Sequence, residues 1–154
     1  MTIGIIVYSQ TGNTLSVAEK LEQSLKENGY AVTLERILAE NDTPRASAPM
    51  SLTFSPDTTP YDTIIFASPV QAFSLCPVMR QYLAQVSDLS GKKVCCFVTQ
   101  HLKKPWMGGN HAVKQIKSAC ESKGAPLSAS GVVNWSGPTR DNQIADIVNR
   151  LSHL

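Results

Sequence analysis

Short apolar runs alternate with amphipathic stretches along this 154-residue chain, and this alternation constrains the fold more than any other feature. The apolar runs predict five strands, over residues 3–8, 31–36, 63–67, 94–98 and 127–135. Apolar residues at helical spacing predict four helices, within residues 15–25, 77–86, 113–120 and 144–151. Because strands that alternate with crossover helices pair in parallel, we expect one α/β domain over residues 1–154, with a five-stranded parallel sheet and helices on both faces.

Composition and charge exclude several classes of protein. Only 17% of the residues are charged, 42% are hydrophobic, and no segment approaches the roughly 20 apolar residues that a membrane helix needs. The formal net charge of +2 is far below what binding to a nucleic acid backbone usually requires, so we expect neither a nucleic acid nor a membrane partner.

The small net charge hides an uneven distribution. Residues 1–62 carry four basic and eight acidic side chains, whereas residues 92–123 carry seven lysines against Glu121 alone. Such a basic stretch favours association with small anions or with an acidic partner.

The four cysteines show neither Cys-x-x-Cys spacing nor zinc-ligand spacing, so we expect a reduced, cytoplasmic protein without a metal site. Cys95 and Cys96 are adjacent on a predicted strand and should fill the core on opposite faces of the sheet. Cys76 is expected in a loop, which makes it the one thiol whose reactivity is of interest.

Residues 39–60 do not fit the alternating pattern. This segment holds four of the nine prolines and has no helical periodicity, although it must connect two strands. We expect an irregular crossover, with a contact to a partner or a second subunit as the alternative.

The polar segment Ser9-Gln10-Thr11-Gly12-Asn13-Thr14 lies between the first predicted strand and the first predicted helix. Its hydroxyls and the free N–H groups of the helix start can surround a phosphate. It matches neither GxxxxGK[ST] nor GxGxxG, which disfavours nucleoside triphosphates and NAD in a dinucleotide fold. The alternative is an ordinary turn before a capped helix.

This segment resembles the phosphate loop of the flavodoxin family, [S/T]-x-[T/S]-G-x-T, at every position. The resemblance implies a short-chain flavodoxin-like three-layer sandwich with strand order 2-1-3-4-5, and FMN bound by Ser9, Gln10, Thr11, Gly12, Asn13 and Thr14. Two further loops, after the third and fourth strands, would hold the flavin ring. The expected residues in these loops are Ser68, Pro69, Val70, Gln71, Ala72 and Phe73, then Thr99, Gln100, His101, Trp106, Gly108 and Gly109.

Two departures from the family bear on function. Phe73 and Trp106 stand where electron-carrier flavodoxins typically place a Trp and a Tyr, and the chain is not strongly acidic. His101, Lys103 and Lys104 instead predict a positive field at the third loop.

The resemblance implies electron transfer through bound FMN, with a redox partner protein or NAD(P)H as partner and a monomer or homodimer as the working form. An NAD(P)H-dependent reductase of quinones or flavins is the first alternative. A flavin-independent module that binds a phosphate ligand is the second.

Overall fold

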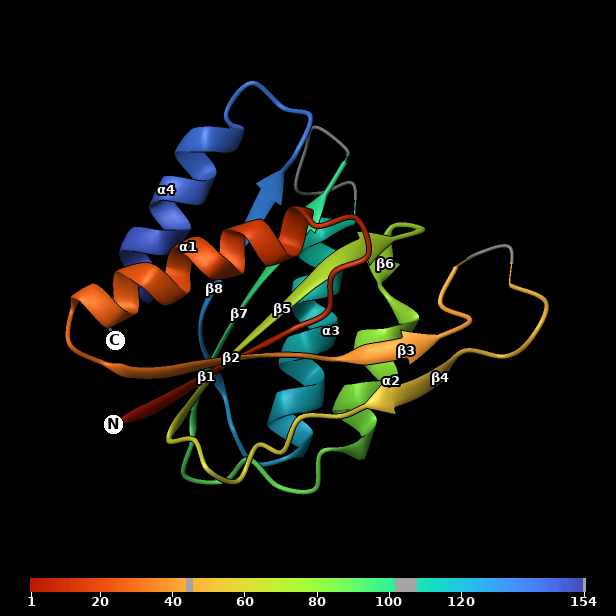
Figure 1. Ribbon diagram of the computed structural model, residues 1–154, viewed down its shortest axis with the longest axis horizontal. Coiled ribbons are helices and arrows are strands. Elements are labelled where there is room, and N and C mark those ends of the chain that lie inside the picture. Colours follow the sequence, from red (N-terminus) through yellow and green to blue (C-terminus); the bar gives the residue numbers. More distant parts are fainter. Residues whose placement is uncertain (44–45, 102–107, 154) are drawn as a thin grey trace.

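The computed structural model describes residues 1–43, 46–101 and 108–153 of the chain. A central parallel sheet has the order β2-β1-β5-β7-β8, and the short strand β6 pairs with β5 off this path (Figure 1). The parallel strands are β1 (Thr2–Val7), β2 (Ala31–Arg36), β5 (Thr63–Gln71), β7 (Lys93–Gln100) and β8 (Leu127–Asn134). The predicted strands and their order 2-1-3-4-5 are confirmed.

The register of the sheet sets the place of the loops. Ile5 in β1 lies beside Leu34 of β2 and Ile65 of β5, and Ile65 lies beside Cys95 of β7. The five strands therefore all end at one edge, called here the carboxyl edge, and all begin at the opposite one, the amino edge. The loops after β1, β5 and β7 meet at the carboxyl edge.

Two helices cover each face of the sheet. The helices are α1 (Asn13–Glu27), α2 (Pro77–Gln85), α3 (Gly109–Ser122) and α4 (Arg140–Leu151). α1 and α4 pack on one face, and α2 and α3 pack on the other (Figure 1). Cys95 and Cys96 belong to these two separate layers, as expected for neighbouring residues of a strand.

The segment expected to be an irregular crossover instead forms an antiparallel hairpin. Its strands are β3 (Leu38–Glu40) and β4 (Ser51–Phe54), which pair with a register shift at Leu38/Ala39. Ala39, Met50 and Leu52 pack against the layer that holds α2 and α3. The expectation was wrong because strands of three and four residues are too short to produce a readable alternation.

Among the described helices, none is both long enough and apolar enough to cross a membrane.

Candidate functional site

The segment between β1 and α1 forms a loop that is exposed at residues 10–12. Gly12 precedes the helix in a left-handed conformation, with φ 95°. The hydroxyl oxygen of Ser9 accepts bonds from the amides of Gly12 and Leu15, both at 3.2 Å, and so draws the loop around itself. Gln10, Thr11 and Gly12 are exposed, and the first turn of α1 holds no acidic residue. An anion can therefore approach the free N–H groups of the helix start.

Thr14 lies behind this loop. It is only 1% exposed, and its hydroxyl is 2.7 Å from that of Thr99, at the end of β7. The two buried hydroxyls tie the start of α1 to the carboxyl end of β7. Thr14 therefore fixes the position of the loop.

The second predicted loop is a hairpin, since β5 continues four residues past the predicted end at residue 67. Ser68 is buried within β5, and Pro69 and Val70 follow it in the same strand. Gln71 then pairs with the first residue of β6 (Ser74–Leu75). The interpretation of Ser68-Pro69 as the start of a loop was wrong, because the strand gains further partners from β7 and β6.

Ala72 and Phe73 form the two-residue turn of this hairpin. Both are left-handed, with φ 51° and 62°, although neither is glycine. A two-residue hairpin turn of type I′ has positive φ at both central residues, and an L-residue held there costs roughly 1–2 kcal/mol. The turn carries Phe73 outward, with 63% of its surface exposed.

The phosphate loop and this hairpin are joined by side chains. The Gln71 amide nitrogen donates to the Gln10 side-chain oxygen at 2.8 Å, and the Gln10 nitrogen donates to the carbonyl of Asp42 at 3.4 Å. The Tyr8 hydroxyl donates to the Asp42 carboxylate at 2.6 Å, and burial, followed by this carboxylate, raises the pKa of Tyr8. Gln10 and Gln71 line a cavity of about 660 Å³ that reaches the first turn of α2. The carboxyl edge thus has a hollow beside the β5–β6 hairpin.

The third predicted loop follows β7. Thr99 and Gln100 are buried, and the Gln100 amide nitrogen donates to the Asn134 side chain. His101 is exposed, and its carbonyl accepts a bond from the Ser136 hydroxyl. Trp106, Lys103 and Lys104 lie outside the described residues.

Glycines at the start of α3 bring this loop against the hairpin. A Cβ atom on Gly108, whose φ is 120°, would lie 2.8 Å from the Cα atom of Phe73. A Cβ atom on Gly109 would lie 2.6 Å from Val132. Neither position can hold a larger residue without displacement, so the two predicted ring loops touch through Gly108 and Phe73.

The basic stretch 92–123 does not gather at this site. Lys93 opens β7, Lys92 donates to the carbonyl of Tyr61 at 2.6 Å, and Lys123 follows the end of α3. All three lie at the amino edge, because the stretch runs along the molecule once as β7 and back as α3. These three lysines therefore do not contribute to the positive field that is predicted at the third loop.

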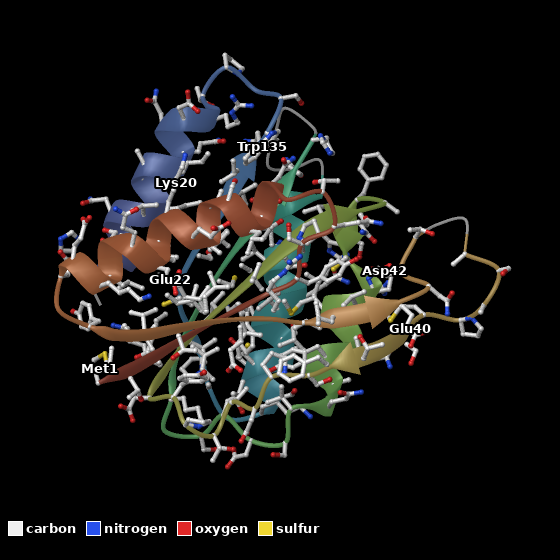
Figure 2. All side chains as sticks on the ribbon, viewed as in Figure 1. Met1, Lys20, Glu22, Glu40, Asp42 and Trp135 are labelled. Atoms are coloured by element: carbon white, nitrogen blue, oxygen red, sulfur yellow. The ribbon has the colours of Figure 1, made fainter. Side chains whose placement is uncertain are left out.

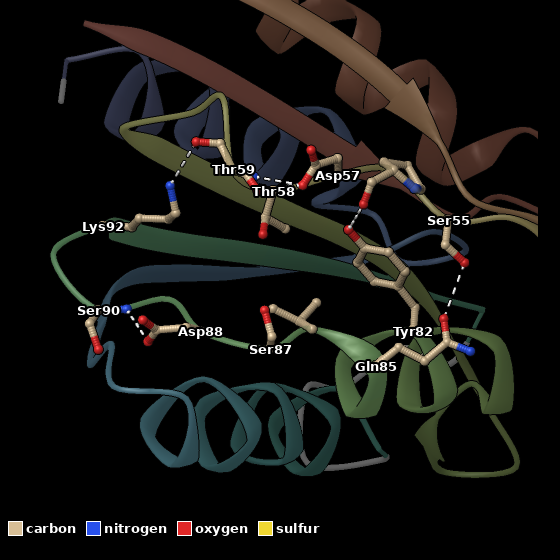
Figure 3. A pocket seen from close by; sticks show the side chains of 12 residues that line it. Ser55, Asp57, Thr58, Thr59, Tyr82, Gln85, Ser87, Asp88, Ser90 and Lys92 are labelled. Atoms are coloured by element: carbon tan, nitrogen blue, oxygen red, sulfur yellow. Dashed lines mark hydrogen bonds between the residues drawn. The ribbon is translucent and has the colours of Figure 1, made fainter.

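The amino edge has a polar cavity of its own, of about 500 Å³ (Figure 3). Its polar groups hold the surrounding turns. Asp57 accepts bonds from the amide and hydroxyl of Thr59, and Asp88 accepts from the amide of Ser90, which lowers the pKa of each carboxylate. The Tyr82 hydroxyl donates to the carbonyl of Pro56. The polar groups of this cavity therefore stabilise the turns around it.

Cys76, the one thiol considered for reactivity, is fully buried at the start of α2. Its sulfur lies 3.0 Å from the Ser68 hydroxyl oxygen, and burial raises the pKa of the thiol. A buried, protonated thiol is a poor nucleophile, so the structure does not support a reactive role.

Two further contacts at the carboxyl edge involve residues that the sequence did not single out. The side-chain oxygen of Gln115 accepts bonds from the Ser74 hydroxyl at 2.9 Å and from the Leu75 amide at 2.7 Å. The guanidinium of Arg140 lies 5.1 Å from the ring centre of Trp135. Trp135 and Asp42 flank opposite ends of the edge (Figure 2). No local motif signals the Gln115 bonds, because they join α3 to residues 41 and 40 positions away in β6.

Comparison with solved structures places the fold among flavodoxins and related flavoproteins. The chain superposes on Megasphaera elsdenii flavodoxin with a TM-score of 0.70 at 20% identity, covering 99% of both chains. The Trp repressor binding protein of Bacillus subtilis gives a TM-score of 0.72 at 17% identity, covering 98% of this chain and 99% of that one.

A third neighbour is a flavoprotein of Lactobacillus acidophilus solved in complex with FMN. It gives a TM-score of 0.67 at 17% identity, covering 94% of this chain and 97% of that one. No protein-family model matches the chain, and no curated protein matches it significantly. The fold is flavodoxin-like, and at these identities the likeness concerns the fold alone.

Proposed function

We propose that this chain binds FMN at the carboxyl edge of its flavodoxin-like sheet and serves in electron transfer. The observation that carries the proposal is the loop of residues 9–14. It leaves Gln10, Thr11 and Gly12 exposed at a helix start without an acidic residue, while Ser9 closes the loop from within. The amides of Gly12 and Leu15 donate to Ser9, so the described contacts leave the Asn13 and Thr14 amides as donors of this loop for a phosphate group. The exposed Thr11 hydroxyl adds a further donor.

The remaining residues fit the other end of the same cofactor. The hairpin turn at Ala72–Phe73 and the glycines at 108–109 meet at the point where β5 and β7 end. Ligands of open α/β sheets bind at this edge, beside the strand where the order reverses, which here is β1. FMN supplies the redox chemistry when bound, and the protein positions it. Phe73 provides an exposed aromatic surface for the ring.

The phosphate loop determines whether the protein prefers FMN to riboflavin, which lacks the phosphate. Thr11→Glu adds a carboxylate to the exposed loop and should repel the phosphate, lowering FMN affinity by about tenfold or more while riboflavin binding changes little. Thr53→Glu places the same charge on the exposed strand β4 and should leave both affinities unchanged. Titrations of the wild type and both variants, followed by flavin fluorescence, measure the affinity of each protein for FMN and for riboflavin.

Three results of this titration would contradict the proposal or narrow it. If neither flavin binds, FMN is not the cofactor, and binding of inorganic phosphate alone would favour a flavin-independent module. If Thr11→Glu leaves FMN affinity unchanged, the phosphate does not lie in this loop.

The identity of the electron donor is tested with the FMN-loaded protein. We propose a redox partner protein or NAD(P)H as the partner. Rapid oxidation of NADH or NADPH without a second protein, followed at 340 nm, would indicate a reductase. A flavin that is reduced only in the presence of a partner protein would indicate a carrier.

A further inference from the structure

The turn of the β5–β6 hairpin is held in a conformation that its own residues disfavour. Ala72 and Phe73 both have positive φ, and a two-residue turn leaves the strands no slack to relax it. Left-handed backbone at residues other than glycine persists only where surrounding contacts fix it. The question is which contacts hold this turn.

Helix α3 contacts the hairpin at two points on one helical face. Gly108, which precedes the helix, packs against the backbone of Phe73. A Cβ atom added to Gly108 would lie only 2.8 Å from the Phe73 Cα atom. Gln115 lies seven positions further, or about two turns, and so shares that face. Its side-chain oxygen accepts bonds from both residues of β6, at 2.9 Å from the Ser74 hydroxyl and 2.7 Å from the Leu75 amide.

The bond from the Leu75 amide matters most for the position of the turn. Leu75 is buried, and only Ser74 separates it from the turn. Gln115 thereby fixes β6, the strand that leaves the turn, while pairing with β7 fixes β5, the strand that enters it. Pro77, one residue beyond Cys76, begins α2 and adds no amide donor of its own. Besides the core packing of Leu75, the Gln115 oxygen thus anchors β6 to α3 through both residues of the strand.

We propose that Gln115 is a positioning residue for the flavin ring, because it holds the strained Ala72–Phe73 turn that presents Phe73. This inference rests on the proposed function. A turn fixed before binding lowers the ordering cost of the ligand that contacts it. Loss of the acceptor should therefore weaken binding of the ring. The phosphate loop should keep its position, because Gln71, which bonds to Gln10, belongs to β5, and β5 is held by its pairing with β7.

Two substitutions of similar length separate the acceptor from packing. Gln115→Met removes the acceptor, and Gln115→Glu keeps an oxygen that accepts both bonds. We expect Gln115→Met to weaken FMN and riboflavin by the same factor, about tenfold, so that their affinity ratio stays constant. Gln115→Glu should bind riboflavin, which carries no phosphate, nearly as the wild type does. A purely structural role would lower the melting temperature of Gln115→Met without changing flavin affinity at 25 °C.

The strain is tested by relaxing it. Ala72→Gly accepts positive φ without penalty, so Gln115→Met should cost much less flavin affinity in that background. An equal loss in both backgrounds would overturn the proposal.

Hydrogen exchange of the Leu75 amide in the flavin-free protein tests the anchor independently of the cofactor. Exchange should be faster in Gln115→Met and unchanged in Gln115→Glu. Unchanged exchange in Gln115→Met overturns the anchor whether or not flavin binds. Failure of the wild type to bind either flavin overturns the proposed function and with it the ring-positioning role.

Discussion

The buried pair Thr14–Thr99 allows a quantitative test of how the phosphate loop is fixed. The hydroxyls lie 2.7 Å apart, and the two residues are 1% and 3% exposed. Thr14→Val or Thr99→Val alone leaves one buried hydroxyl without its partner, which costs about 1–3 kcal/mol, whereas replacing both with apolar groups of the same shape is close to neutral. The double variant should therefore lose less unfolding free energy than the sum of the single variants, with a coupling of at least about 2 kcal/mol.

Urea denaturation of the flavin-free protein, followed by far-UV circular dichroism, measures this cycle. With a slope of about 1–3 kcal/mol per M urea, a loss of 1.5 kcal/mol moves the midpoint by roughly 0.5–1.5 M, well within resolution. Thr63→Val is the matched control, since Thr63 is equally buried but its hydroxyl donates to the Met1 sulfur, a weak acceptor, at 3.6 Å. Additive losses, within about 0.5 kcal/mol, would refute the bond as a fixed contact.

Three more predictions follow from the described contacts. Gly108→Ala should lower flavin affinity and cost about 1–3 kcal/mol of stability, because its Cβ would meet the Phe73 backbone at 2.8 Å; unaltered binding in titrations would contradict the contact between the loops. The four thiols are all buried, so a thiol reagent should label none rapidly at neutral pH and all four in denaturant, and one fast equivalent in the folded protein would show an opening that the structure lacks. Burial and the Glu35 carboxylate raise the pKa of Tyr61 from 10.0 to about 12, so the folded state keeps the proton that the unfolded state loses; the wild type should lose stability relative to Tyr61→Phe as pH rises from 10 to 12, and a pH-independent difference in urea midpoints would contradict this.

The sequence was sufficient for features that depend on nearby residues. The strands, the four helices and the exposed loop at residues 9–14 follow from local patterns of apolar residues, hydroxyls and glycine. Parallel strands then bring three loops to one edge without further information. Expectations that depended on topology alone were therefore largely confirmed.

The features that were missed depend on contacts between distant residues. β5 extends to Gln71 because β6 and β7 supply partners, and β3 pairs with β4 across a long connection. The bond that Gln115 accepts from Leu75 spans 40 residues, and a glutamine in a helix gives no sequence signal of such a contact. The basic stretch does not form one patch, since Lys92, Lys93 and Lys123 lie at the amino edge, away from the third loop. The predicted positive field at that loop stays a prediction, because Lys103 and Lys104 lie outside the described residues.

The separation of Cys95 and Cys96 by the plane of the sheet has a consequence for oxidation. A disulfide requires its two Cβ atoms about 3.5–4.5 Å apart on the same side, whereas neighbouring residues of a strand point in opposite directions. The folded chain thus keeps two adjacent thiols from ever joining, and the unfolded chain does not. Folding itself protects this pair, so refolding should proceed with a reductant present until the sheet has formed.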